Sequence, residues 1–492
     1  LSGRMAGVFH CKPSLALSYQ SLQQAKFACV TNFHRPSRRP LIRAIFWGRN
    51  VNNAVEINNV NFPSKELELK ESTPNSDLHQ NPSKAISIFV VSSIAEVSPS
   101  DWDACNLEST SPEDFNPFLS HAFFSSLEES CSAVKETGWI PCHVVAKDEE
   151  GNVTGVIPLY LKSHSYGEYV FDHSWAEAYY SYGGRYYPKF QSCVPFTPVT
   201  GPRILIRRSP YRNQIFKIMV AALKNLTVKS KVSSLHVTFS SEEEWDMLKE
   251  EGFLQRKGMQ YHWENRNYKT FDEFLMDMKQ NKRKNIRQER KKIADQNLKM
   301  KRLRGNEITA KHWDLFYMFY RNTTDNKWGT PYLTREFFHI LGSKMKDKVL
   351  LVIAEDEEDR IVAGALNLIG GSTLYGRHWG CHPNVFYLNL HFEACYYQAI
   401  EGAIEMGLKR VEAGAQGEHK IQRGYLPVTT YSCHFVVDDA FKMAIEKFLV
   451  KESKQVRGNV LGLKKLCLMG FCRWIWSLRC CMILPLSKIG EN

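Results

Sequence analysis

The sequence lacks the short motifs by which most nucleotide-binding enzymes are recognised. It has no GxGxxG loop and no Walker loop to hold a dinucleotide or a nucleoside triphosphate. It also lacks an apolar run of the ~18 residues that a bilayer span needs. The cysteines between Cys105 and Cys433 form no CxxC pairs and have no histidine partners at metal spacing. We therefore expect no metal, and free thiols in a reducing compartment.

Acidic residues are absent from the start of the chain. Residues 1–50 contain eight Lys and Arg, and the first carboxylate is Glu56. Together with several serines, this composition predicts an organelle transit peptide over residues 1–55, and a disordered basic tail is the alternative. Residues 56–84 are rich in Asn, Ser, Pro, Lys and Glu, which predicts a linker.

The end of the chain, residues 453–492, is apolar and basic. Trp474 and Trp476 lie in it, and Arg473 and Arg479 interrupt its apolar pattern. A short helix lying on a membrane surface is one interpretation, and a nonnative or alternatively encoded extension is the other. We assign this tail no catalytic function.

The net charge of +12 is concentrated in one internal segment. Residues 279–304 contain twelve Lys and Arg against Glu289 and Asp295, whereas most of the remaining chain is close to balanced. We expect a basic helix over about residues 271–297. Its cations could bind the phosphates of a cofactor or a tRNA, although a solvated helix face is the ordinary interpretation. The predicted phosphate-binding residues are Arg283, Lys284 and Arg287.

Two stretches of sequence recur in the same order. Residues 117–127 (PFLSHAFFSSL) match residues 331–341 (PYLTREFFHIL) at an offset of 214. Residues 145–153 (VAKDEEGNV) match residues 353–361 (IAEDEEDRI) at an offset of 208. The two collinear matches predict a duplicated domain.

The element pattern is similar in the two predicted domains, residues 85–266 and 267–452. Each half reads as a strand, a helix capped by Ser120 or Thr334, an antiparallel hairpin, and then alternating helices and strands. This order predicts mixed sheets covered by helices, an α/β or α+β fold. Further expectations concern single elements: strands over residues 168–171 and 259–264, the latter closing the first half, and a long helix over residues 389–406.

The densest polar segment is residues 412–425 (EAGAQGEHKIQRGY), which follows a predicted strand over residues 410–412. Its glycines allow a ligand to approach the backbone, and its side chains could accept a proton or hold an anion. A charged surface loop is the alternative. The predicted proton-accepting residues are Glu418 and His419, and the predicted substrate-binding residues of this segment are Gln416, Lys420 and Arg423.

Three smaller groups complete the predicted substrate-binding residues. Arg377 and His378 end a predicted strand and would face opposite sides of a regular one. His391 and Glu393 lie near the start of the long helix, where the helix dipole alone would favour a carboxylate. In the first half, the group is Tyr166, Glu168 and Asp172, whose carboxylates either have raised pKa values among the aromatic side chains or cap strand ends.

Several longer motifs are similar to those of the FemAB-like predicted N-acyltransferases. They span about residues 115–451, and they include SYGEYVFD at 165–172, VPFTPVTGPR at 194–203, YGRHW at 375–379, HFEACYYQAI at 391–400 and GAQGEHK at 414–420. The resemblance implies two tandem GNAT-type acyltransferase domains. It also implies attack of an amine on an activated acyl carbonyl, with Glu418 or His419 as base and Arg377, Lys420 and Arg423 holding the anion.

Three functions agree with this resemblance. The first is an N-acyltransferase that uses acyl-CoA and a small-molecule or peptide amine. The second is an aminoacyl-tRNA-dependent transferase, which the basic helix favours. The third is a noncatalytic binding protein that keeps the fold. The transit-like start of the chain points to the chloroplast, with the mitochondrion as the alternative.

Overall fold

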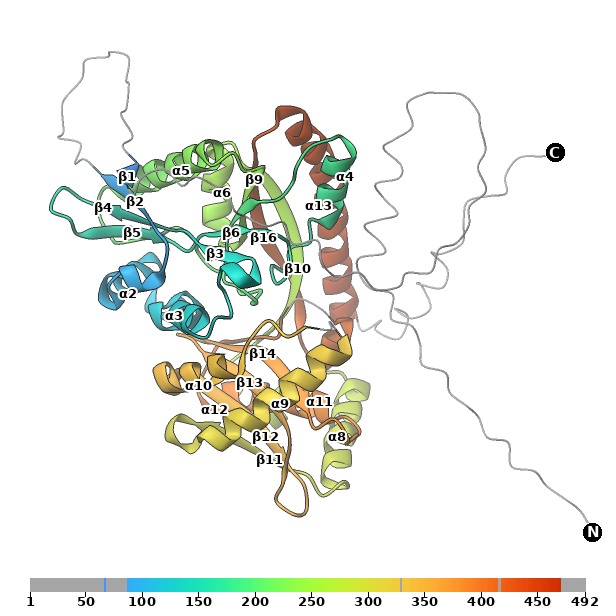
Figure 1. Ribbon diagram of the computed structural model, residues 1–492. Helices are drawn as coiled ribbons and strands as arrows, with labels where there is room; N and C mark the ends of the chain where they lie inside the picture. Colours follow the sequence, from blue (N-terminus) through green and yellow to red (C-terminus); the bar gives the residue numbers. More distant parts are fainter. Residues whose placement is uncertain (1–65, 68–85, 328–329, 415–416, 470–492) are drawn as a thin grey trace, which may run out of the picture.

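The structure is a computed structural model, and it describes residues 66–67, 86–327, 330–414 and 417–469 (Figure 1). Two sheets organise these residues. The smaller sheet has the strand order β1-β2-β4-β5-β8, and the larger has the order β11-β12-β13-β14-β15-β10-β16-β9-β7-β6-β3. Both contain mainly antiparallel pairs, and two parallel pairs in the larger sheet make it mixed.

The first half contains these strands: β1 (Glu66–Leu67), β2 (Ser87–Val91), β3 (Trp139–Pro141), β4 (His143–Lys147), β5 (Val153–Ile157), β6 (Tyr160–Lys162), β7 (Lys189–Ser192), β8 (Leu205–Ile206), β9 (Ser234–Ser240) and β10 (Leu254–Glu264). Its helices are α2 (Pro99–Ser109), α3 (His121–Glu129), α4 (His173–Ser181), α5 (Arg212–Lys229) and α6 (Glu242–Glu250). Short 3-10 turns connect several of them.

The second half contains the helices α7 (Phe271–Met276), α8 (Gln280–Ala294), α9 (Ala310–Lys327), α10 (Arg335–Lys344), α11 (Leu390–Phe392), α12 (Gln398–Glu405) and α13 (Asp439–Met469). Between α11 and α12 lies a π-helical turn, η7 (Glu393–Tyr397), and a 3-10 segment, η8 (Glu418–Arg423), precedes the last strand. The strands are β11 (Lys299–Arg304), β12 (Val349–Glu355), β13 (Ile361–Ile369), β14 (Thr373–Cys381), β15 (Arg410–Glu412) and β16 (Leu426–Val436).

The two repeated sequences fold alike. Ser120 and Thr334 each cap a helix by accepting a hydrogen bond from the backbone N–H three residues later. The β4–β5 and β12–β13 hairpins also share a register shift, between Ala146 and Lys147 and between Ala354 and Glu355. An irregularity at the same place in both repeats supports duplication of one ancestral unit.

The last strand of each half joins the sheet of the other half. β10, from the first half, pairs with β15, and β16, from the second half, pairs with β9. β10 and β16 also pair with each other along their length, and α13 packs on both (Figure 1). The predicted strand over residues 259–264 is therefore confirmed as the end of β10, and its pairing with β15 and β16 makes one sheet continuous between the two halves.

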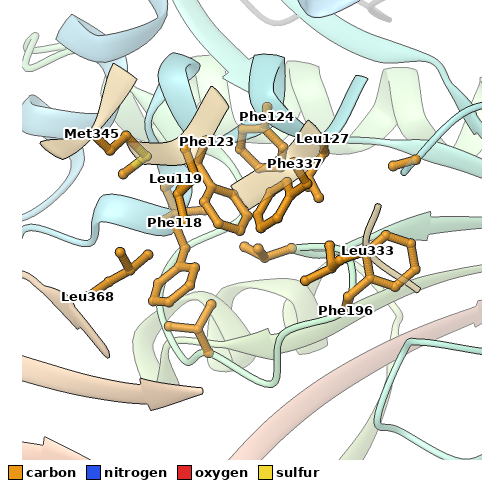
Figure 2. Packing of buried hydrophobic residues seen from close by; sticks show 14 of the residues in the cluster. Phe118, Leu119, Phe123, Phe124, Leu127, Phe196, Leu333, Phe337, Met345 and Leu368 are labelled. Atoms are coloured by element: carbon orange, nitrogen blue, oxygen red, sulfur yellow. The ribbon is translucent and has the colours of Figure 1, made fainter. Parts of the chain in front are cut away.

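A large apolar core joins the halves. Phe118, Phe123 and Phe124 from around α3 meet Phe337 from α10, with the Phe123 and Phe337 ring centroids 6.0 Å apart (Figure 2). Because equivalent helices of the two repeats pack against each other, neither half buries its apolar helix face alone.

Other predicted elements differ in detail. Residues 168–171 are not a strand, because this loop is fixed by buried side chains instead of a ladder. The predicted basic helix is broken between α7 and α8, and the predicted long helix is interrupted by η7. α13 extends to Met469, into the predicted tail. Among the described residues, no helix has the length and apolarity that would carry it across a bilayer.

Candidate functional site

β14 and β15 separate after a short parallel contact. They pair over only three residues each, from Thr373 opposite Arg410 to Tyr375 opposite Glu412. β14 then continues to Cys381, while the chain after Glu412 leaves the sheet and enters the Gly-containing loop predicted as the main polar segment. The parallel strands therefore open into a wedge at their carboxyl ends, where sheets of this kind usually build their sites.

A β-bulge re-aims the side chains at the start of this wedge. Leu366 pairs with His378 and Asn367 pairs with Gly376, so Arg377 is an extra residue in β14. Arg377 and His378 therefore line the same cavity, and the expectation of opposite faces is wrong because the strand is irregular. Burial lowers the pKa of His378 to about 4, so its ring is neutral at pH 7.

The cavity beside the bulge lies between the two halves. Its walls are mostly apolar, and they include Phe118 and Phe196 from the first half and Phe337 from the second. Its volume is about 10 Å³, which is close to the space that one water molecule needs. The junction is therefore nearly closed, and only a small group fits without movement of the aromatic side chains.

Arg377 forms a buried ion pair with Glu412 at the point where β14 and β15 part. The Nη2 to Oε2 distance is 3.2 Å, and the two side chains are only 4% and 2% exposed. Thr200, from the first half, donates a hydrogen bond to the other Glu412 carboxylate oxygen, at 3.1 Å. Burial lowers the pKa of Arg377, and Glu412 opposes that shift. The Arg377 Nε–H has no acceptor among the described residues, so one donor remains for a ligand or a water.

Lys420 closes the loop that follows β15. Its ammonium donates to the carbonyl oxygens of Ala413, at 2.5 Å, and Gly414, at 3.2 Å. Burial lowers the pKa of Lys420 to about 7. The two carbonyl acceptors favour the charged form, so we expect a cation that holds the loop together at neutral pH.

His419 belongs to an aromatic group on the α11 side of the wedge. Its Nε2 lies 2.9 Å from the Tyr396 hydroxyl, and its ring centroid is 6.2 Å from that of His391. Trp379 contacts His391 edge to face at 5.3 Å. The π-helical turn η7 carries Tyr396 into this group, and such turns are frequent at functional sites. Glu418, the first residue of η8, precedes His419 and is half-buried.

Two residues that were predicted to bind substrate, Arg423 and Glu393, form ion pairs within the protein instead. Arg423 donates to both Glu289 oxygens, at 2.8 and 3.0 Å, and thereby ties η8 to the basic helix α8. Glu393 is buried and accepts from Arg290 of α8 at 3.1 Å. One Glu393 oxygen has no hydrogen-bond partner among the described residues. These contacts fix α8 beside the wedge.

The three predicted phosphate-binding residues are divided among different contacts. Arg283 donates to the Met276 and Met278 carbonyl oxygens, at 3.4 and 3.5 Å, and Arg287 pairs with Asp272 at the surface. Lys284 is exposed. The exposed cations of this segment are Lys279, which precedes α8, and Lys284, Arg287, Lys291 and Lys292 of α8.

The predicted residues of the first half lie in a separate cluster. Glu168 and Asp172 are buried and both bind Lys189, whereas Tyr166 is 54% exposed.

Gln416 lies outside the described residues. Sequence reasoning missed Lys162, Lys189 and the Arg377 partner Glu412. A lysine ending an otherwise apolar strand, as Lys162 does, was the available signal.

The wedge brings hydrogen-bond donors and an imidazole beside two separated strands. Its backbone groups, the spare Arg377 donor and the nearby His419 are of the types that hold an oxyanion and accept a proton. Within the described ranges, no three His, Cys, Asp or Glu side chains are grouped as metal ligands.

A profile of the FemAB-like family, described as serving peptidoglycan biosynthesis and recognition, matches residues 93–467. The chain belongs to the FemAB-like family. This membership and the mixed sheets confirm the predicted resemblance and fold class. At the level of the family, the protein is a transferase of acyl or aminoacyl groups, and the acyl-CoA donor stays a prediction.

Solved structures similar to this FemAB-like chain share little sequence with it. FemX is 11% identical, with 71% of this chain and 98% of that chain covered at a TM-score of 0.46. L-PGS from Bacillus licheniformis is 9% identical, with 66% and 95% covered at a TM-score of 0.40. The C-terminal domain of a putative lysylphosphatidylglycerol synthetase from Agrobacterium fabrum is 9% identical, with 73% and 97% covered at 0.43. No curated protein sequence matches the chain significantly.

Proposed function

We propose that this FemAB-like protein transfers an acyl group from acyl-CoA to an amine in the wedge between β14 and β15. The observation that carries the proposal is the short parallel contact of these strands, with the Arg377 bulge where they part. Separated parallel strands expose backbone N–H groups that a thioester carbonyl and an extended carrier can use.

In the proposed reaction, the nitrogen of a neutral amine attacks the acyl carbonyl carbon. The C–N bond forms, the carbonyl electron pair moves to oxygen, and the C–S bond then breaks. The leaving thiolate takes a proton, and the ammonium nitrogen loses one to a base. We assign that base to His419 or Glu418, with Arg377 as an electrostatic support for the oxyanion.

An aminoacyl-tRNA donor is the second candidate. The outward cations of α8 favour it, because Arg423 and Glu289 fix this helix directly against the loop beside the wedge. An ester carbonyl of aminoacyl-tRNA would be attacked in the same way as a thioester. Binding through phosphates would weaken steeply with salt.

Acyl transfer to hydroxylamine tests the proposal without knowledge of the natural acceptor. Hydroxylamine is a small nucleophile that is largely neutral at pH 7, and its acyl product, a hydroxamate, is readily weighed by mass spectrometry. We expect the full chain to form a hydroxamate from at least one member of an acyl-CoA series faster than hydroxylamine does without protein. Catalysed product from aminoacyl-tRNA alone would show that aminoacyl-tRNA, and not acyl-CoA, is the donor. No catalysed product from either carrier would contradict the function.

The cellular location is proposed from the N-terminal composition. If residues 1–55 are a transit peptide, they will direct a fused fluorescent protein to the chloroplast. Diffuse cytosolic fluorescence would contradict this proposal, and mitochondrial fluorescence would support the alternative organelle.

A further inference from the structure

Four buried charges lie on β6, β7 and the loop that joins β6 to α4. Lys162 and Lys189 are directly opposite each other on the paired strands, and both side chains are 0% exposed. Two neighbouring ammonium groups without water repel each other and need compensation. Glu168 and Asp172, both in the loop, supply it. We call Lys162, Glu168, Asp172 and Lys189 the charge quartet.

The quartet is closely connected. Lys189 Nζ lies 2.7 Å from a Glu168 oxygen and also binds Asp172, and Lys162 Nζ lies 3.8 Å from the other Glu168 oxygen. Lys189 and Asp172 are ionised at neutral pH, whereas burial lowers the pKa of Lys162 and raises that of Glu168, each to about 7. The quartet has no net charge whether Lys162 and Glu168 are both ionised or both neutral. Removing the loop from this position would leave two lysines buried without counter-ions, which is strongly unfavourable. The strands therefore hold the loop electrostatically.

Additional contacts hold the loop on both sides of one residue, Tyr169. Before it, the Gly167 carbonyl oxygen accepts from the Phe196 N–H at 3.1 Å, and Ser165 Oγ accepts from Lys189 at 2.8 Å. After it, the Phe171 carbonyl oxygen accepts from Arg256 at 2.8 Å. Tyr169 is therefore held by its neighbours in the chain.

Tyr169 itself has an unusual backbone and an available hydroxyl. Its φ is +58°, in the left-handed region that a bulky side chain rarely occupies. Such strain persists only where the surroundings impose it, and it is concentrated at functional sites. The side chain is half-buried, and its hydroxyl has no hydrogen-bond partner among the described residues.

The loop that carries Tyr169 lies against the junction of the two halves, because Gly167, two residues before Tyr169, binds the Phe196 N–H. Phe196, which binds the loop, stacks on Tyr332 at a centroid distance of 5.2 Å and lines the cavity that Arg377 lines. Burial raises the pKa of Tyr169, and Arg377 lowers it in part. The hydroxyl thus remains protonated at neutral pH and is a donor.

We infer that the charge quartet holds the loop so that Tyr169 donates a hydrogen bond to the carbonyl oxygen of the acyl group during transfer. This inference rests on the proposed function. As the amine attacks, the carbonyl electron pair moves onto oxygen and the Tyr169 O–H stabilises it. The pair returns when the thiolate leaves, and Tyr169 keeps its proton. The first half would thus supply a catalytic residue to a site in the second half.

Substitution Tyr169→Phe removes the hydroxyl and keeps the ring. With the acyl-CoA that the wild type uses and hydroxylamine as acceptor, we expect kcat to fall about 100-fold while the donor KM changes less than about 2-fold. The matched control is Tyr182→Phe, because Tyr182 is 79% exposed. A kcat within about 3-fold of wild type, or a loss confined to KM, would overturn the assignment.

The loop-holding role has a measurement that needs no turnover. The balanced double variant K189M/D172N removes one charge of each sign from the quartet, which limits the risk of unfolding. Amides of residues 163–172 should then exchange with deuterium at least about 10-fold faster, while those of β12 and β13 stay unchanged. Unchanged exchange in the loop would overturn the role of the quartet. If the wild type uses no acyl carrier, both the proposed function and the Tyr169 assignment are contradicted. The deuterium exchange of the loop then still tests whether the charge quartet holds it.

Discussion

The residue that organises the candidate site is Arg377, an extra residue in its strand. The bulge turns it toward Glu412, and the pair is closed to solvent on both sides. A buried ion pair contributes little net stability compared with apolar side chains of similar size. Removing one partner, however, leaves the other charge buried without compensation, which is strongly destabilising. Its retention at the start of the wedge therefore agrees better with a role in positioning than with one in stability.

Substitution Glu412→Gln tests the pair. It leaves the Arg377 guanidinium buried beside a neutral amide, so we expect the free energy of unfolding to fall by about 3–5 kcal/mol in urea titrations. Lys299→Gln is the control, because the Lys299–Asp359 pair is exposed and should contribute nothing measurable. Equal effects of the two changes would show that the Arg377–Glu412 pair is not desolvated as described.

His378 makes stability depend on pH. Its pKa is about 4 when folded and near 6.5 when unfolded, so the unfolded chain binds more protons between these values. Stability is therefore lost as the pH falls from 6.5 to 4. Substitution His378→Gln should reduce that acid-induced loss by about 3 kcal/mol, measured by urea unfolding at pH 7, 5 and 4. An unchanged pH dependence would mean that the fold does not lower the pKa of His378.

The polar residue types of this site were predictable from the sequence, but their partners were not. Lys420 and Arg423 are found in the predicted segment, but internal acceptors bind both of them. The acceptors are separated from them in sequence or are backbone atoms, so no local pattern indicates them. The position of Arg377 depends on one additional residue in β14, which hydrophobic alternation does not reveal.

At the scale of elements, the hairpin turns give the clearest record of duplication. Asp148 accepts from the N–H groups of Glu150 and Asn152, and Asp356 accepts from those of Glu358 and Arg360. The acidic sequence of these turns predicted the hairpins correctly, because turn chemistry is local. The exchange of β10 and β16 was not predicted, because it depends on contacts between distant segments.

Both equivalent turns should be destabilised by the same substitution. Asp148→Ala and Asp356→Ala each remove an acceptor of two backbone hydrogen bonds, so we expect both to lower the urea midpoint. Asp356→Ala should lower it more, because Asp356 also pairs with the Arg360 guanidinium. The corresponding Asn variants keep a carbonyl acceptor and should lose less. An alanine variant with an unchanged urea midpoint would mean that its turn does not depend on the aspartate as described.

At the scale of the whole molecule, the exchanged strands make the halves interdependent. Without β16, the first half has an unpaired β9 edge, and without β10 the second half has an unpaired β15 edge. Such edges favour aggregation. The shared phenylalanine core would be exposed as well (Figure 2).

Fragments test this interdependence. We expect residues 86–266 alone to be unfolded or aggregated by circular dichroism and size-exclusion chromatography. Co-expression with residues 267–469 should restore a soluble complex. A folded, monomeric first fragment would contradict the description of the exchanged strands as necessary to both halves.

The most direct test of the central claim is hydroxamate formation by the full chain from acyl-CoA and hydroxylamine, compared between wild type and Arg377→Gln. The account predicts turnover by the wild type and a loss of at least about 10-fold in kcat for the variant. Arg321→Gln, at an exposed arginine of α9, should retain wild-type turnover. Equal turnover by Arg377→Gln and wild type would contradict a reaction at the wedge between β14 and β15.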